Sequence, residues 1–168
     1  RNKGLEVRVA RYHNIFGPYG TWDGGREKAP AAFCRKVAEA EPNSEIEVWG
    51  PGNQTRSFLY IDECVEATYR LMQSDFTGPV NIGSEEMIDI NDFARMAIKI
   101  SGKNLQLYNI DGDGFIAKYG HCCPVGVNGR NSNNALYQEK IGWSVSEPLF
   151  DGMKKTYAWI AEQVEKKV

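Results

Sequence analysis

No apolar run in this sequence approaches the roughly 20 consecutive residues that a membrane-spanning helix requires. The opening residues, RNKGLEV, lead into no apolar segment, so we expect no signal peptide. An excess of basic charge is missing as well, because 20 lysines and arginines face 22 acidic residues and leave a net charge of -2. We therefore expect neither a membrane nor a nucleic acid as a partner.

The sequence also has few cysteines, and no secretory context accompanies them. There are four: Cys34, Cys64, Cys122 and Cys123. We expect reduced thiols and a cytoplasmic location. Cys34 and Cys64 fall within helical patterns and are predicted to be buried. Adjacent Cys122 and Cys123 cannot pair without heavy strain. His121 next to them has no second ligand pair at zinc-like spacing, so no metal site is expected.

A glycine-rich dinucleotide turn of the G-x-G-x-x-G type is missing after every expected strand. The chain also opens directly into a strand, and a buried parallel sheet needs neighbours on both sides of such a strand. With 168 residues, 42% of them hydrophobic, the chain is nevertheless long enough to build a core. We therefore expect residues 1–168 to be one partial domain of a larger unit.

Patterns typical of strands alternate with patterns typical of helices, which predicts an α/β fold with a mainly parallel sheet. Strands are expected at residues 5–12 (buried), 46–49, 57–61, 80–83 and 105–110. Helices are expected at residues 30–40, 132–141 and 149–164. Another helix should begin at Asp62, with Val65, Tyr69 and Met72 facing inward. A further helix should run from Asp89 or Asn91 to Gly102. Residues 111–129 are glycine-rich and aperiodic, and we expect a loop there.

The stretch 7–30, VRVARYHNIFGPYGTWDGGREKAP, joins a strand, a polar glycine-rich loop and the start of a helix. In α/β proteins, ligands bind at such junctions beyond the carboxyl ends of the strands. The loop offers His13, Asn14, Arg26, Glu27 and Lys28. Pro30 suits the first turn of a helix, whose free N–H groups favour anions. The stretch is therefore predicted to form a binding site.

Three motifs carry a resemblance to a known family: RYHNIFGP at 11–18, QTRSF at 54–58 and VNIGS at 80–84. With these the chain resembles the C-terminal half of an extended short-chain dehydrogenase/reductase, a family of NAD-dependent epimerases and dehydratases that act on nucleotide sugars. The strings GTWDGGREKAPAAFCRK, FLYIDECVEATYRL and GRNSNN resemble the branch that epimerises GDP-mannose at C3 and C5. The resemblance covers nearly the whole chain, but residues 111–125 do not match it.

The resemblance implies the C-terminal half of a Rossmann-like parallel sheet plus a small substrate-binding lobe. It also implies an isomerase: NAD oxidises the sugar at C4, the protons at C3 and C5 are exchanged to the opposite face, and the hydride returns. GDP-mannose would become GDP-L-galactose, a step toward plant ascorbate, in a homodimer. The NAD turn, the Tyr-x-x-x-Lys pair and the cysteine base would lie in the N-terminal half that is absent here. We therefore expect no cofactor-binding residue in this chain, and no activity from it alone.

The resemblance also places substrate-site residues on this sequence. Lys28 matches the acid that returns a proton to the sugar, and Arg56 and Arg130 match arginines that bind the diphosphate. Asn14 matches a substrate contact, although asparagine also serves as an ordinary turn residue. Further matched positions are Glu27, Ala29, Lys36, Gln54 and Thr55. Two alternatives remain open: another nucleotide-sugar epimerase, dehydratase or decarboxylase, or a non-catalytic module that binds a nucleotide sugar or dimerises.

Overall fold

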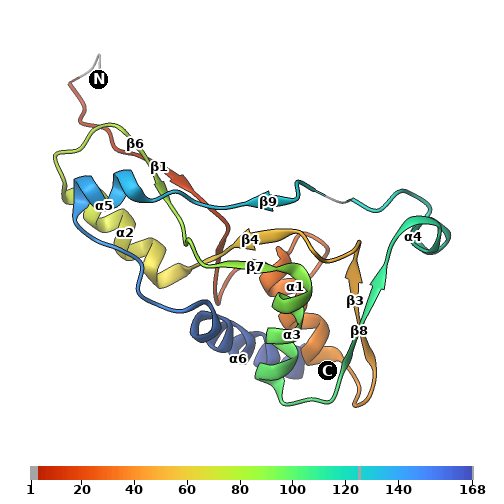
Figure 1. Cartoon of the computed structure of the whole chain (residues 1–168). Helices are drawn as coiled ribbons and strands as arrows, with labels where there is room; N and C mark the ends of the chain where they lie inside the picture. The colour runs from red at the N-terminus through yellow and green to blue at the C-terminus, as the bar shows by residue number, and fades with distance from the viewer. Residues whose placement is uncertain (1–3, 125, 168) are drawn as a thin grey trace.

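The alternation of strands and helices expected from the sequence is present in the computed structural model, which describes residues 4–124 and 126–167 (Figure 1). The strands are β1 Val9–Tyr12, β2 Ile15–Phe16, β3 Glu45–Trp49, β4 Thr55–Ser57, β5 Leu59–Tyr60, β6 Pro79–Ile82, β7 Met87–Asp89, β8 Gln106–Ile110 and β9 Gly129–Arg130. The helices are α1 Ala29–Glu39, α2 Ile61–Gln73, α3 Ile90–Ser101, α4 Gly112–Tyr119, α5 Ala135–Ile141 and α6 Leu149–Lys167. No helix in these described ranges combines the length and the apolar character that crossing a bilayer demands.

Parallel strand pairs dominate, as predicted. β1 pairs with β6, β2 with β5, β3 with β8 and β4 with β9, all in parallel. The β4–β7 pair is antiparallel. The strands are short and form separate small sheets in a mixed α/β arrangement. The α/β class is therefore confirmed.

The prediction that the first strand is buried was wrong. Leu5, Val9 and Tyr12 are 68%, 44% and 53% exposed, and β1 begins only at Val9. Within the described residues β1 has one strand neighbour, β6, so its other edge has no strand to pair with. Branched side chains on such an edge have nothing to pack against, although their type favours a strand.

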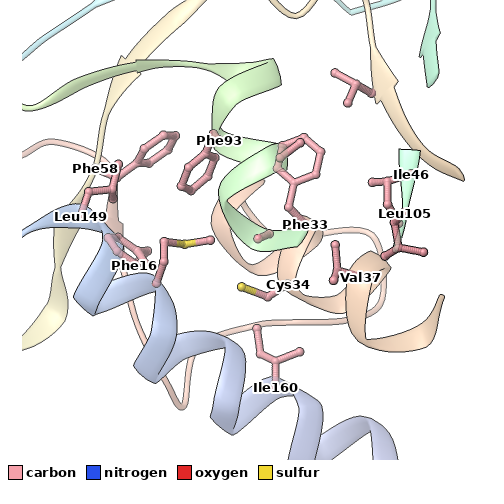
Figure 2. Packing of buried hydrophobic residues seen from close by; sticks show 14 of the residues in the cluster. Phe16, Phe33, Cys34, Val37, Ile46, Phe58, Phe93, Leu105, Leu149 and Ile160 are labelled. Atoms are coloured by element: carbon pink, nitrogen blue, oxygen red, sulfur yellow. The ribbon is translucent and has the colours of Figure 1, made fainter. Parts of the chain in front are cut away.

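A hydrophobic core lies where α1, α3 and α6 meet the strands (Figure 2). Phe93 of α3 is fully buried between two other rings. Its ring stacks on Phe58 at a centroid distance of 4.5 Å and meets Phe33 edge-on at 6.1 Å. A second cluster joins α2, β6 and α5, and includes Leu59, Cys64, Ala67, Leu71, Val80, Ile82 and Tyr137. Cys34 and Cys64 are buried in these cores, as predicted.

The ends of α3 and the start of α1 were predicted well from capping and first-turn residues. The carboxylate of Asp89 accepts a hydrogen bond from the Asp92 backbone N–H at 2.7 Å, so Asp89 and not Asn91 caps α3. Gly102 ends that helix in the left-handed conformation, with φ of 70°. α1 carries Pro30 in its first turn.

The buried face of α2 was predicted incorrectly. Val65, Tyr69 and Met72 are 59%, 58% and 62% exposed, whereas Cys64, Ala67 and Leu71 face the core. The helix begins at Ile61, after Tyr60, and has no side-chain cap from Asp62. Two apolar stripes run side by side on this helix, and periodicity alone does not say which one packs against β6 and α5.

Several other expectations need correction. The strand expected at 57–61 is interrupted at Phe58 and forms the pair β4 and β5 instead. The helix expected at 132–141 starts only at Ala135, and the last helix continues to Lys167. The short strands β2, β7 and β9 were not foreseen, because two or three residues carry no readable alternation.

The segment 111–129 is not simply a loop, because it contains the helix α4. The Asp111 carboxylate accepts a hydrogen bond from the Gly112 N–H at 2.7 Å, and Gly120 closes the helix in the left-handed conformation. Phe115 is fully buried, with its ring edge-on to Trp49 at 5.2 Å. Glycines inside the helix lowered its apparent helical propensity, which explains the error. Val125 of this segment lies outside the described residues.

Candidate functional site

A cavity of about 380 Å³ opens between β2, β4 and the N-terminus of α1. It is lined by Asn14, Ile15, Lys28, Ala29, Pro30, Arg56, Phe58 and Ile90. We call it the Lys28 cavity. Residues from the loop after β1, from the start of α1, from β4 and from the start of α3 therefore meet at one place.

Lys28 occupies the N-cap position of α1. Its backbone is extended, with φ of -79° and ψ of 163°, and its carbonyl accepts a hydrogen bond from the Ala32 N–H at 2.9 Å. The side chain is exposed, and it lines the cavity beside Ala29 and Pro30. The first turn of a helix leaves backbone N–H groups without intrahelical partners, which favours anions at this end of the cavity.

Arg56 and Arg130 lie side by side on parallel strands. They are register partners in the β4–β9 pair, and register partners project to the same face of a sheet. Arg56 is half-buried, and its Nη1 donates to the Thr55 carbonyl at 2.7 Å. Gly126 passes so close that a Cβ atom there would lie 3.3 Å from Arg56 Nη2. Neither arginine forms an ion pair with a carboxylate of the described residues, so both guanidinium groups retain capacity to bind an anion.

Asn14 combines a structural and a site position. Its φ of 47° places it in the left-handed region, which asparagine tolerates well. Its Nδ2 donates to the Ser57 carbonyl at 2.9 Å, and its own carbonyl accepts from the Leu59 N–H at 3.1 Å. Asn14 therefore ties the loop after β1 to β4 and β5, and this connection brings the loop next to Arg56.

Gln54 and Thr55 precede Arg56 in the chain. Gln54 is only 6% exposed, and its Oε1 has no hydrogen-bond donor among the described residues. The backbone N–H of Thr55 donates to the Asn128 carbonyl at 2.8 Å, which holds the chain before β9 against β4. Neither residue lines the Lys28 cavity, but both fix the backbone from which Arg56 projects.

Glu27 and Lys36 are directed elsewhere. Arg35 Nη2 donates to Glu27 Oε1 at 2.7 Å. Burial works to raise the pKa of this carboxyl, but the hydrogen bond and charge of Arg35, together with hydrogen bonds to the backbone of Glu27 and Gly25, outweigh it and hold the pKa below its ordinary value. Lys36 Nζ donates to the Glu47 carbonyl at 2.8 Å, and burial lowers the pKa of this amine. Neither side chain lines the Lys28 cavity.

The apolar wall of the cavity was not foreseen. It consists of Ile15, Phe58 and Ile90. A signal existed for Phe58, because it lies two residues after Arg56 in an extended segment. No comparable signal existed for Ile90, which reaches the cavity only through the folding of α3 against β4.

The described residues do not supply a dinucleotide or metal site. They contain no glycine-rich turn after a strand that would hold the NAD pyrophosphate. No group of three or more histidine, cysteine or acidic side chains within the described ranges is arranged to hold a metal ion.

Comparison with known proteins shows which proteins this chain is similar to. Residues 1–83 match the NAD dependent epimerase/dehydratase family. UDP-N-acetylglucosamine 4-epimerase from Methanobrevibacter ruminantium M1, solved with UDP-N-acetylmuramic acid, superposes with a TM-score of 0.79 at 20% identity, over 95% of this chain and 47% of that chain. UDP-glucuronic acid 4-epimerase from Bacillus cereus, solved with UDP-glucuronic acid and NAD, gives 0.75 at 24% identity, over 95% and 46%. The chain thus has the fold of part of an NAD-dependent epimerase.

Sequence comparison is more specific. The chain is 51% identical over 163 residues to GDP-mannose 3,5-epimerase of Arabidopsis thaliana and to GDP-mannose 3,5-epimerase 1 of Oryza sativa subsp. japonica, over 97% of this chain and 40% of each relative. UDP-glucuronic acid decarboxylase 6 of Arabidopsis thaliana is 28% identical over 153 residues, 91% of this chain and 40% of the relative. The chain therefore spans 40% of the length of these curated relatives, and its resemblance to the C-terminal part of GDP-mannose 3,5-epimerase is confirmed.

Proposed function

We propose that this chain is the substrate-binding part of a GDP-mannose 3,5-epimerase, an isomerase that converts GDP-mannose to GDP-L-galactose. One observation carries the proposal: Lys28 and Arg56 line the same cavity, and Arg130 is the register partner of Arg56. The 51% identity to GDP-mannose 3,5-epimerases supports this choice of substrate. In this proposal residues 1–168 form a partial domain.

The diphosphate of the nucleotide sugar is assigned to the two arginines. A guanidinium fork matches phosphate oxygens in pairs, and two adjacent forks match two phosphates. The first turn of α1, which also lines the cavity, adds backbone N–H groups.

The proton donor is assigned to Lys28. Returning a proton to a sugar carbanion needs an acid within hydrogen-bond reach, and an ammonium group is suited to this. The oxidation and reduction at C4 are assigned to NAD on the N-terminal part that the longer relatives possess. The residues of this chain are assigned only substrate binding and proton donation, and the chain alone is expected to be inactive.

Three finer points belong to the same proposal and rest on the resemblance. The reaction would be a step toward ascorbate in a plant-like organism, the protein would be cytoplasmic, and the enzyme would act as a homodimer. Neither a nucleic acid nor a membrane is included as a partner, since the net charge is -2. Each of these points stays a prediction.

Isothermal titration of the purified chain with GDP-mannose and with UDP-glucose tests the proposal. We expect GDP-mannose to bind and not to turn over. Arg56→Gln should weaken binding about tenfold or more, because charge-assisted hydrogen bonds contribute roughly 1.5–3 kcal/mol. Arg95→Gln is the matched control, since Arg95 pairs with Asp92 on the exposed side of α3. Equal affinities in the unmodified chain and in Arg56→Gln would overturn the assignment.

The same titration separates the two alternatives. Preference for UDP-glucose over GDP-mannose would favour another nucleotide-sugar epimerase or decarboxylase. A non-catalytic module would bind GDP-mannose but give no turnover when mixed with NAD and the N-terminal part of a GDP-mannose 3,5-epimerase. Turnover in that mixture, lost in Lys28→Met, would support the enzyme.

A further inference from the structure

Glu27, the residue immediately before Lys28, has a buried carboxylate. The Glu27 side chain is only 6% exposed, and it does not line the Lys28 cavity. Burying a carboxylate without a partner costs several kcal/mol, so this position depends on a cation. Arg35, two helical turns further on in α1, supplies that cation through a 2.7 Å ion pair.

Arg35 binds more than one carboxylate. Its Nη1 donates to Glu39 Oε2 at 2.8 Å, one turn along α1, and its Nε lies 3.8 Å from Asp23 Oδ1. Asp23 also contacts Lys167 near the end of α6. A planar guanidinium with five N–H donors can join several acceptors at fixed angles, which a lysine cannot do. Arg35 therefore links the loop before α1 to α1 itself and, through Asp23, to α6.

The rest of this loop is also held against α6. The rings of Tyr19 and Trp159 lie 5.4 Å apart, and Lys167 Nζ lies 5.7 Å from the ring of Trp22. The loop is thus attached at its start, in its middle and at Glu27. Lys28 follows the last of these attachments directly, so the Glu27–Arg35 pair holds the chain on one side of Lys28 and the Ala32 N–H bond to its carbonyl holds it on the other.

We propose that Arg35 is a positioning residue that acts through Glu27 to hold Lys28 at the cavity, an inference that rests on the proposed function. In this arrangement Glu27 binds Arg35 rather than the sugar. A proton donor must lie within hydrogen-bond reach of its target, and a displacement of about 1 Å can cost roughly a hundredfold in rate. The pair therefore fixes where Lys28 meets the bound sugar.

The test compares Arg35→Met, Arg35→Lys and the control Arg95→Met in the full chain. The first readout is hydrogen exchange of the backbone amides of residues 24–28. The second is acetylation of the Lys28 amine by acetic anhydride, measured by mass spectrometry with and without saturating GDP-mannose, which should protect the amine. Arg35→Met should keep its affinity for GDP-mannose, because Arg56 and Arg130 are untouched. Exchange should rise about tenfold or more as the segment opens locally, and protection of Lys28 should be lost. Arg35→Lys should recover part of both, and Arg95→Met should change neither.

The inference is overturned if folded Arg35→Met protects Lys28 as well as the unmodified chain does. If Arg35→Met does not fold, the nearly isosteric Glu27→Gln tests the same contact from its other side, with the same expected and contrary results. Failure of the unmodified chain to bind GDP-mannose would overturn the proposed function instead. Amide exchange at 24–28 would then decide the positioning role of Arg35 by itself.

Discussion

Arg56 of β4 and Arg130 of β9 occupy the same register position in a parallel strand pair, so two guanidinium groups project from one face of the sheet. Neither is neutralised by a carboxylate of the described residues. Like charges at directly opposed positions destabilise a sheet. The β4–β9 register therefore lowers the stability of the sheet somewhat, because it places two cationic residues opposite each other.

The first prediction concerns the cost of that arrangement. Arg130→Gln should raise the free energy of unfolding by about 0.2–1 kcal/mol at low salt, because it removes the repulsion. The gain should shrink at high salt, where the charges are screened. Urea unfolding followed by circular dichroism measures both. Arg95→Gln is the control of opposite sign, since it breaks the ion pair with Asp92. A loss of stability in Arg130→Gln would contradict the prediction.

The second prediction concerns Phe93, the centre of the main core (Figure 2). Phe93→Ala should lower the free energy of unfolding by about 3–5 kcal/mol, because it removes a fully buried ring and leaves a cavity. Urea denaturation is the measurement. Phe150→Ala is the comparison, since Phe150 is only half-buried and should give a smaller loss. Equal losses in the two variants would show that Phe93 does not dominate this core.

The third prediction concerns the exposed face of α2. Tyr69 and Met72 lie beside Tyr12 along a largely apolar groove, and exposed apolar patches promote association. Tyr69→Ser with Met72→Ser should reduce self-association of the 168-residue chain without loss of stability. Light scattering measures the self-association, and urea unfolding measures the stability. Leu71→Ser, at a buried position of the same helix, should instead unfold much of the chain.

The core helices could be predicted from the sequence because their signals are local. Phe33 and Val37 recur at helical spacing in α1, and Asp89 and Gly102 mark both ends of α3 by capping chemistry. The orientation of α2 was not predictable, because which apolar stripe is buried depends on contacts with β6 and α5, far away in sequence.

The candidate site was predictable in part for a similar reason. The resemblance assigned roles to Lys28 and Arg56, but that they line one cavity results from long-range packing, to which the bond from Asn14 to Ser57 contributes. The ion pair of Glu27, by contrast, could not be predicted from the sequence. The resemblance placed Glu27 among the substrate-site residues, and that role stays a prediction; no local pattern indicated that its carboxylate pairs with Arg35.

The fourth prediction concerns thiol reactivity. Burial raises the pKa of Cys34 to about 12, and burial also raises the pKa of Cys64. Because the thiolate is the reactive form, both should resist alkylation in the folded chain. Iodoacetamide near pH 8 should modify exposed Cys122 first, and Cys34 only after unfolding by urea. Peptide mass spectrometry locates the label. Rapid labelling of Cys34 without denaturant would contradict its burial.

The last prediction converts the same burial into a pH dependence of stability. Cys34 has an ordinary pKa of 9.0 when the chain is unfolded and about 12 when it is folded. Below pH 9 the thiol is protonated in both states, so this group does not make stability depend on pH. As the pH rises from 9 toward 12, the unfolded chain releases a proton that the folded chain retains, and the folded state loses stability by up to about 1.4 kcal/mol per pH unit.

Other groups also titrate in this range, so the comparison must be with Cys34→Ala. Urea unfolding at pH 8 and pH 10 should show a smaller decrease in Cys34→Ala than in the unmodified chain, and equal decreases would mean that the thiol ionises in the folded state.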